Sequence, residues 1–345
     1  MDEGKTMRPG EPSPNRETQQ ISGLTFREMR GKADYEMMAE VANASWAADK
    51  VVYLVNAEDI SFDYAPAPNF DPSRDCMLAE VDGRLIGFCS VVCHRNLKNQ
   101  RLFVHSAHLL PEWRSTDIRR VMLRMNEGRG MEIARSQSDD SITFLETWAN
   151  VSDENHWRTI LEQEGYEHYR SILEMERRDL GNIPEFSLPT GVEVKEVRPD
   201  QYATVWHAMN EAMKEDSSYT EGQWSDENME RYIKTPIWTP RLWQIAWKGD
   251  EVVGGVFVFI DKEENERFSR MRGYTEMIFV TRPWRHKGVA HALIARGLRA
   301  LKGEGMEQAA LDVHTDNPSD ALKLYGSLGY ESVKQFGYYR KNLEV

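Results

Sequence analysis

Apolar and polar residues alternate in two stretches of the chain that resemble each other. Residues 78–92 (LAEVDGRLIGFCSVV) predict a strand, an Asp-Gly turn and a second strand, and residues 245–259 (IAWKGDEVVGGVFVF) repeat this order with glycine at matching places. Each hairpin is followed by an apolar strand, a Trp-Arg pair at 113–114 or 284–285, and a basic amphipathic helix. A further strand, a short helix and a Gly-Tyr pair close both series. The pattern predicts a duplicated domain of the mixed α/β class.

The two copies are expected to be separate domains joined by a linker. The segment 179–191 (DLGNIPEFSLPTG) holds two prolines and two glycines, which is typical of a linker. We therefore predict a first domain over residues 23–180, a linker over 181–190 and a second domain over 191–345. The opening residues 1–22 are polar and rich in proline, and we expect them to be disordered.

Composition narrows the classes of protein that fit. The 345 residues include 43 Lys and Arg against 56 Asp and Glu, so the formal net charge is -13. This balance argues against a nucleic-acid partner, because neutralising phosphates needs clustered cations. No apolar run approaches the roughly 18 residues that span a bilayer, and the N-terminal stretch lacks the apolar block of a secretory signal. We expect a cytoplasmic protein with no membrane partner. The three cysteines lack metal-ligand spacing and predict reduced thiols and no metal site: Cys76, Cys89 and Cys93.

The residues that suggest chemistry gather around the second Trp-Arg pair. Residues 277–280 are apolar and favour a strand, Pro283 ends that strand, and an amphipathic helix is predicted to begin near Gly288. A strand that leads into a helix through such a turn leaves unpaired N–H groups at the positive end of the helix dipole, where phosphate binds. Gly288 and Ala290 leave room for phosphate oxygens to approach the backbone. Three basic side chains can add positive charge: Arg285, His286 and Lys287.

Two motifs of the second half resemble those of a known superfamily. The turn from Arg285 to Ala290 has the form Arg-x-x-Gly-x-Ala, and residues 311–330 follow as a strand, an Asn, a helix, a Leu-Tyr pair and a Gly-Tyr pair. Together they resemble the acetyl-CoA pyrophosphate loop and the closing motif of the GNAT N-acetyltransferases. The resemblance implies two tandem GNAT domains, each with a mixed, mostly antiparallel central sheet, flanking helices and splayed central strands. It also implies acetyl-CoA as co-substrate. The cofactor-binding residues that it implies are Phe279, Val280, Arg285, His286, Lys287, Gly288, Val289, Ala290 and Asn317.

Two side chains are candidates for the acid and the base of acetyl transfer, since an ammonium must lose a proton and the departing thiolate must gain one. Tyr325 matches the general acid of the superfamily, and the alternative is a tyrosine that only packs under the sheet. Glu276 lies four residues before Val280, so we expect both on the same face of the strand. Glu276 is the candidate base, and the alternative is a solvated edge carboxylate. The resemblance places the backbone donor to the thioester oxygen near Val280 or Phe279. Asn317 either helps to hold the pantetheine arm or caps a helix.

The first copy keeps the outline of this pattern but not its chemical groups. When the Trp-Arg pairs are aligned, Asp117 stands in place of the glycine of the turn. A carboxylate about 4 Å from a phosphate charge costs on the order of 4 kcal/mol at an effective dielectric of 20. In the same alignment, Leu161 stands in place of Tyr325, and His105 stands in place of Glu276. We therefore expect the first domain to be a degenerate GNAT domain with a structural role. The arginines of its helix are expected on a solvated face: Arg119, Arg120, Arg124, Arg129 and Arg135.

These inferences lead to one predicted function and one alternative. We expect an acetyl-CoA-dependent N-acetyltransferase, a monomer or homodimer, that moves an acetyl group to a primary amine of a small molecule or peptide by direct transfer in a ternary complex. No cysteine lies near the predicted site, which agrees with transfer without an acyl-enzyme. Residues 206–243 are expected to choose the acceptor, and their carboxylates could attract a cationic amine: Asp216, Glu221, Asp226 and Glu230. The alternative is a non-catalytic acyl-CoA-binding or regulatory protein with the same two domains.

Overall fold

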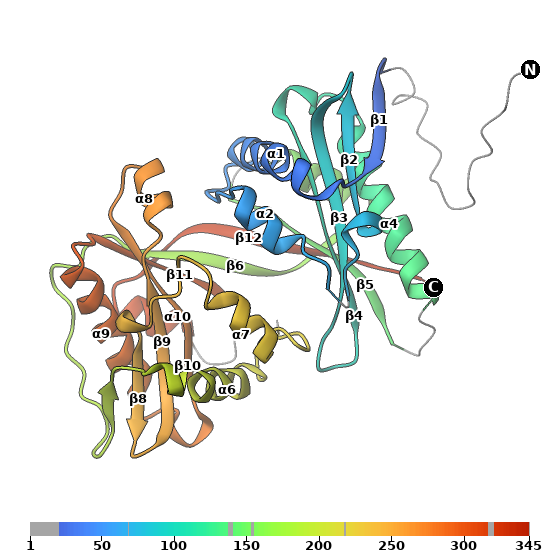
Figure 1. The fold of residues 1–345 in the computed structure, drawn as a ribbon. Coiled ribbons are helices and arrows are strands. Elements are labelled where there is room, and N and C mark those ends of the chain that lie inside the picture. Colours follow the sequence, from blue (N-terminus) through green and yellow to red (C-terminus); the bar gives the residue numbers. More distant parts are fainter. Residues whose placement is uncertain are drawn as a thin grey trace, which may run out of the picture. The chain divides into compact units, whose positions relative to one another are not determined.

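The computed structural model describes residues 21–67, 69–136, 141–152, 155–216, 219–316 and 321–344 (Figure 1). The chain forms two compact units. The second unit is Arg170–Phe336, and the first consists of the residues before and after that segment. The tail predicted to be disordered lies outside the described residues, apart from Ile21 and Ser22.

The first unit is a sheet with helices on both faces. Its strands lie in the order β1-β2-β3-β4-β5-β12, with antiparallel pairing from β1 to β4 and parallel pairing of β4 with β5. The helices α1 and α2 lie over one face and α4 lies over the other (Figure 1). The strands are β1 (Leu24–Glu28), β2 (Cys76–Val81), β3 (Arg84–Arg95), β4 (Arg101–Leu109), β5 (Thr143–Asn150) and β12 (Glu331–Asn342), of which the residues from Gly337 onward belong to this unit. The helices are α1 (Tyr35–Ala48), α2 (Ala57–Asp63), α3 (Pro72–Asp75), α4 (Ile118–Ser136) and α5 (His156–Gln163), with short 3-10 turns η2 (Gly31–Ala33) and η3 (Pro111–Trp113).

The hairpin predicted over residues 78–92 is confirmed. Asp82 (φ 49°) and Gly83 (φ 80°) connect β2 and β3 in the left-handed conformation that a two-residue hairpin turn requires. The strands and the facing helices bury a continuous apolar core because their side chains alternate between the two faces of the sheet. Members of this core include Met38, Leu78, Ile86, Phe88, Phe103, Met122 and Leu145.

The second unit has the same kind of sheet. Its strands lie in the order β6-β11-β10-β9-β8-β7; β10 and β11 pair in parallel, and the other described neighbours pair antiparallel. These strands are β6 (Glu167–Arg177), β7 (Glu193–Lys195), β8 (Gln244–Lys248), β9 (Glu251–Phe259), β10 (Arg272–Val280) and β11 (Gln308–His314). The helices are α6 (Tyr202–Met213), α7 (Asp226–Tyr232), α8 (Lys262–Arg267), α9 (Val289–Gly303) and α10 (Ala321–Ser327), with 3-10 turns η4 (Pro199–Gln201), η5 (Pro240–Leu242) and η6 (Arg282–Trp284). Two mixed, mostly antiparallel sheets flanked by helices confirm the predicted fold class.

The sheet of the second unit has a separate core on each face. One core lies under α9 and α10, and it contains the apolar positions from which an amphipathic helix after Gly288 was predicted: Val289, Leu293, Ile294, Leu298 and Leu301. The other core lies under α6 and is rich in aromatic rings: Trp206, Trp243, Trp247, Phe257 and Phe279. The site described below lies in the sheet between these two cores.

The structure divides the chain at other places than the sequence predicts. The predicted first domain ends at residue 180. In the structure, the first unit consists of two segments, one that ends at Tyr169 and one that begins at Gly337. The Leu343 amide donates to the Thr143 carbonyl at 3.0 Å, and Lys341 forms an ion pair with Glu127 at 2.9 Å, so the C-terminal segment is built into the first unit. The predicted linker, residues 181–190, belongs to the second unit.

Candidate functional site

A β-bulge in β10 determines where the candidate base points. Glu276 pairs with Phe257 of β9, but Phe279 pairs with Gly255, so β10 holds one extra residue between the two pairs. The backbone accommodates the extra residue at Met277, which adopts a left-handed conformation (φ 46°). Paired residues of an antiparallel ladder face the same side of the sheet. Glu276 therefore shares a face with Phe279, and the prediction that it shares a face with Val280 is wrong, because the extra residue reverses the alternation.

The central strands β10 and β11 separate halfway along their length. Their parallel ladder covers three pairs, from Arg272 with Gln308 to Tyr274 with Ala310. Beyond Tyr274, a side chain bridges the two strands: the Asp312 amide of β11 donates a hydrogen bond to Glu276 Oε1 of β10 at 2.9 Å. This divergence agrees with the splayed strands that the family resemblance implies.

The backbone of β10 points one amide, that of Val280, toward the gap between β10 and β11. The Thr281 amide donates to the Val253 carbonyl of β9 at 2.9 Å. Successive amides of a strand point to opposite neighbours, so the Val280 amide points away from β9, toward the side from which β11 has separated. Of the two predicted positions for the backbone donor, Val280 is the one with this direction.

The environment of Glu276 favours a carboxyl group that holds its proton more tightly than usual. Burial raises its pKa well above the ordinary value, and the negative charge of Asp312 raises it further. The hydrogen bond from the Asp312 amide opposes both effects without cancelling them. A carboxylate with a raised pKa is a stronger base than a solvated one.

The turn before α9 presents open backbone amides. Gly288 is the N-cap of α9 in a left-handed conformation (φ 78°), and a Cβ at this position would have no heavy atom within 4 Å. The Ala292 amide donates to the Gly288 carbonyl at 3.1 Å. The amides of the residues before it in the first turn of α9, including Val289 and Ala290, have no acceptor among the described residues. The surface in front of this turn is therefore open and bears a positive potential.

The basic residues of the turn have different roles in the structure. Arg285 anchors the turn: its Nε donates to the Val280 carbonyl at 3.1 Å, and its guanidinium forms an ion pair with Glu215. Lys287 places its ammonium 4.9 Å from the centre of the Trp284 ring. Positive charge for a phosphate is thus more available from Lys287 than from Arg285, whose charge is already neutralised.

Tyr325 lies in α10, in the core beneath the sheet, with 7% of its surface exposed. Its hydroxyl has no hydrogen-bond partner among the described residues, whereas the neighbouring Tyr330 hydroxyl is 2.7 Å from Thr275 Oγ1. Burial raises the pKa of Tyr325, and the charges of Glu276 and Asp216 raise it further, so this phenol stays protonated at neutral pH. Asn317, predicted to contact the cofactor or to cap a helix, lies outside the described residues.

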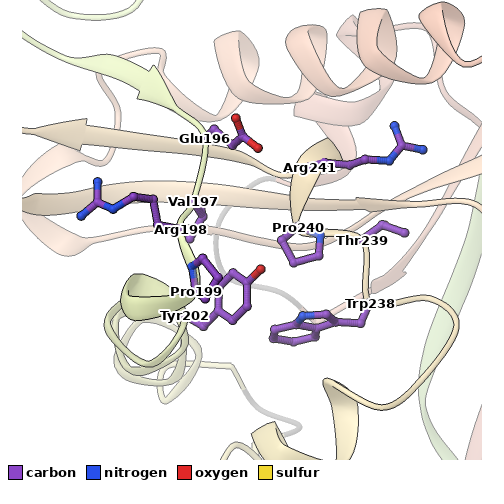
Figure 2. A pocket seen from close by; sticks show the side chains of 9 residues that line it. All are labelled: Glu196, Val197, Arg198, Pro199, Tyr202, Trp238, Thr239, Pro240 and Arg241. Atoms are coloured by element: carbon purple, nitrogen blue, oxygen red, sulfur yellow. The ribbon is translucent and has the colours of Figure 1, made fainter.

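A pocket that the sequence did not predict lies on the face of the sheet that Glu276 shares. The pocket has a volume of about 600 Å³. Figure 2 shows the side chains that line it: Glu196, Val197, Arg198, Pro199, Tyr202, Trp238, Thr239, Pro240 and Arg241. The rings of Tyr202 and Trp238 meet edge to face at 5.5 Å. A chain of rings leads from Trp238 through Trp243 to Phe257, the strand partner of Glu276. The sequence feature that could have indicated this pocket is the high density of tryptophans in residues 206–243. Without a motif, that density does not predict a pocket.

The carboxylates that were expected to attract a cationic acceptor are not gathered into one site. Asp226 is exposed and lies 2.6 Å from His207 Nε2. Glu221 and Glu230 are also exposed. Asp216 alone lies near the candidate acid, since its charge contributes to the raised pKa of Tyr325.

In the first unit, an arginine occupies the corresponding place. The strands β4 and β5 pair in parallel only from Arg101 to Val104, so they also separate. Arg119, which aligns with Ala290, is 3% exposed, donates to the Ala107 carbonyl of β4 at 2.9 Å and forms an ion pair with Asp49. The predicted solvated position of Arg119 is therefore wrong. Its guanidinium lies 4.8 Å from the Trp157 ring centre, so side chains fill this opening.

Two classes of site are not found in the described part of the chain. No group of three or more His, Cys, Asp or Glu side chains there is arranged to hold a metal ion. None of the helices described is long and apolar enough to cross a membrane.

Comparisons with known proteins agree with this geometry. Residues 206–330 match the family model described as Acetyltransferase (GNAT) family. The chain is 27% identical over 270 residues to a mycothiol acetyltransferase of Streptomyces bingchenggensis, an alignment that covers 76% of this chain and 79% of that protein. It is 32% identical over 106 residues to N-alpha-acetyltransferase MAK3 of Arabidopsis thaliana, covering 31% of this chain and 53% of that protein.

Solved structures share the fold over nearly the whole chain. A GCN5-related N-acetyltransferase from Sphaerobacter thermophilus has a TM-score of 0.69 at 20% identity, covering 93% of this chain and 96% of that one. A tandem GNAT protein from the clavulanic acid biosynthesis pathway has a TM-score of 0.65 at 15% identity, covering 93% and 99%. The second unit thus contains a GNAT acetyltransferase domain, and the chain is an acyltransferase. More particularly, the chain resembles mycothiol acetyltransferases in sequence and a tandem GNAT protein in fold.

Proposed function

We propose that the second unit transfers an acetyl group from acetyl-CoA to a primary amine of a small molecule or peptide, directly and within a ternary complex. The observation that carries this proposal is the open turn at Gly288 beside the gap between β10 and β11. Glu276 spans this gap, and Tyr325 lies close enough for the Glu276 charge to affect its pKa. The amides of Gly288, Val289 and Ala290 would receive the diphosphate, with Lys287 and His286 adding charge.

The proposed residues account for every proton in the reaction. Glu276 takes a proton from the ammonium of the acceptor, directly or through one water, and the freed amine attacks the thioester carbon. The Val280 amide donates to the carbonyl oxygen as negative charge develops there. The C–S bond then breaks, and Tyr325 gives its proton to the departing sulfur. The proton that the new amide nitrogen releases returns Tyr325 to its neutral form. Glu276 then gives the proton that it took from the ammonium to solvent, so one proton is released in each turnover.

Release of free CoA thiol tests the function. Purified full-length protein with acetyl-CoA is expected to release thiol only when a suitable amine is added, across a panel of amino sugars, aminoglycosides, other amines and peptides. Mass spectrometry should show one added acetyl group on the amine. If acetyl-CoA binds but no member of a broad panel is acetylated, the proposed transfer to a primary amine is contradicted.

The raised pKa of Glu276 predicts a stability effect with a definite sign. Below the ordinary pKa of a glutamate, the carboxyl is protonated in both the folded and the unfolded chain and has no differential effect. As the pH rises, the unfolded chain ionises first and is favoured, so the folded state loses stability until Glu276 also ionises. Glu276→Gln keeps the oxygen that accepts from the Asp312 amide. The variant should therefore gain in melting temperature over the wild type as the pH rises above 4.5, the ordinary pKa of a glutamate.

The control for this measurement is Glu307→Gln, which changes an exposed glutamate of the same unit. Its melting temperature should follow that of the wild type at every pH. A Glu276→Gln difference that stays constant with pH would show that the folded state does not favour the protonated carboxyl.

One acetyl-CoA is expected per chain, because Arg119 fills the opening of the first unit while Gly288 faces open space in the second. Isothermal titration of the full chain should give a stoichiometry near one. The isolated first half is not a suitable sample, because Gly337–Val345 completes that unit. Two equivalents of bound acetyl-CoA would contradict a structural role for the first unit.

A further inference from the structure

The segment that the sequence predicts as a linker is fixed along α9. Lys302 donates to the Gly181 carbonyl at 3.1 Å, and Arg299 donates to the Pro184 carbonyl at 2.8 Å. Phe186 then contacts His291, with ring centroids 5.0 Å apart. The segment therefore runs antiparallel to the helix, from its C-terminal end to its first turn.

Phe186 is an exposed aromatic ring beside the turn that is proposed to bind phosphate. Its neighbours Ile183 and Leu188 pack against the core under α9, but Phe186 keeps 39% of its surface exposed. His291 is the third residue of α9, and at a rise of about 1.5 Å per residue it lies less than one turn from Gly288. Because the Phe186 ring is partly exposed beside the turn at Gly288, a flat ligand can cover its exposed surface.

We infer that Phe186, supported by His291, is the platform on which the adenine base of acyl-CoA stacks. The inference rests on the proposed function, since it takes the diphosphate to be held at Gly288. The adenine is joined to that diphosphate through a single ribose, so the base must lie near the turn that holds the phosphates. Stacking a base on an aromatic side chain contributes about 1–3 kcal/mol. The segment between the two copies thereby acts as part of the nucleotide site.

The experiment compares two ligands that differ by the 3′-phospho-AMP part, which carries the adenine. Binding of CoA and of 4′-phosphopantetheine, which lacks the nucleotide, is measured by titration on the full chain, on Phe186→Ala and on Phe186→Trp. Phe186→Ala should weaken CoA binding by about 5- to 150-fold and leave phosphopantetheine binding unchanged. Phe186→Trp should retain CoA binding, because the indole also offers a flat ring.

The matched control is Phe268→Ala. Phe268 is also 39% exposed, and it contacts Arg270 in a different part of the unit. This variant should bind both ligands as the wild type does. The inference is overturned if Phe186→Ala binds CoA like the wild type, or if it weakens both ligands equally, which would mean that Phe186 only positions the turn. If the wild type itself fails to bind CoA, the proposed function falls as well.

Discussion

Tyr325→Phe is expected to lower kcat by about 10²- to 10⁴-fold, the range that a general acid contributes, while acetyl-CoA binds as before. The Tyr325 hydroxyl has no hydrogen-bond partner among the described residues, so its removal leaves none of their polar groups unpaired. The ring itself, which packs in the core under α9, is retained in phenylalanine. The loss should therefore appear in turnover, measured as thiol release at saturating acetyl-CoA, and not in stability or in cofactor affinity.

Tyr330→Phe is the matched control for this result. Tyr330 lies in the same core, with its ring centroid 6.2 Å from that of Tyr325, but its hydroxyl is engaged with Thr275. Losing that buried hydrogen bond should cost about 1 kcal/mol of stability and leave most of the turnover. If Tyr325→Phe turns over like the wild type, Tyr325 is a packing residue and the thiolate obtains its proton elsewhere.

The elements of the fold could be predicted because their signals are local. Asp82 and Gly83 mark the turn of one hairpin, and Gly249 marks the other. The apolar positions after Gly288 mark the buried face of α9. The unit boundaries depend instead on where the last strand packs, and no pattern within residues 331–345 encodes which sheet receives it. The Lys341 and Leu343 contacts with the first unit are long-range in sequence, so the duplicated pattern suggested two sequential domains.

The residues proposed for the site belong to motifs of the sequence, but the directions of their side chains do not follow from those motifs. The motif indicates Glu276 and Val280, but the face on which each lies depends on a bulge at Met277. Methionine has no special preference for the left-handed conformation, whereas glycine or asparagine would have signalled one. In the first unit, the charge of Asp117 predicts a lost phosphate site. The group that fills the opening is Arg119, whose burial depends on the distant Asp49.

Gly288→Asp is expected to weaken acetyl-CoA binding about a thousandfold. The Gly288 Cβ position faces open space, and aspartate tolerates a left-handed conformation better than most residues, so the helix should still form. The new carboxylate would stand about 4 Å from a phosphate charge, at a cost on the order of 4 kcal/mol for an effective dielectric of 20. That cost corresponds to about three powers of ten in Kd. Titration of the full chain with acetyl-CoA measures it.

Two variants separate charge from shape in this experiment. Gly288→Asn has nearly the same size and backbone tolerance as aspartate but no charge, so it should lose far less affinity. Gly305→Asp places the same carboxylate at another left-handed glycine (φ 83°) with open space around it, beyond the C-terminal end of α9, and should bind normally. Equal losses in Gly288→Asp and Gly288→Asn would mean that the turn is only sterically sensitive. Unchanged binding in Gly288→Asp would show that no phosphate lies at the start of α9, because a like charge at that distance cannot be neutral in energy.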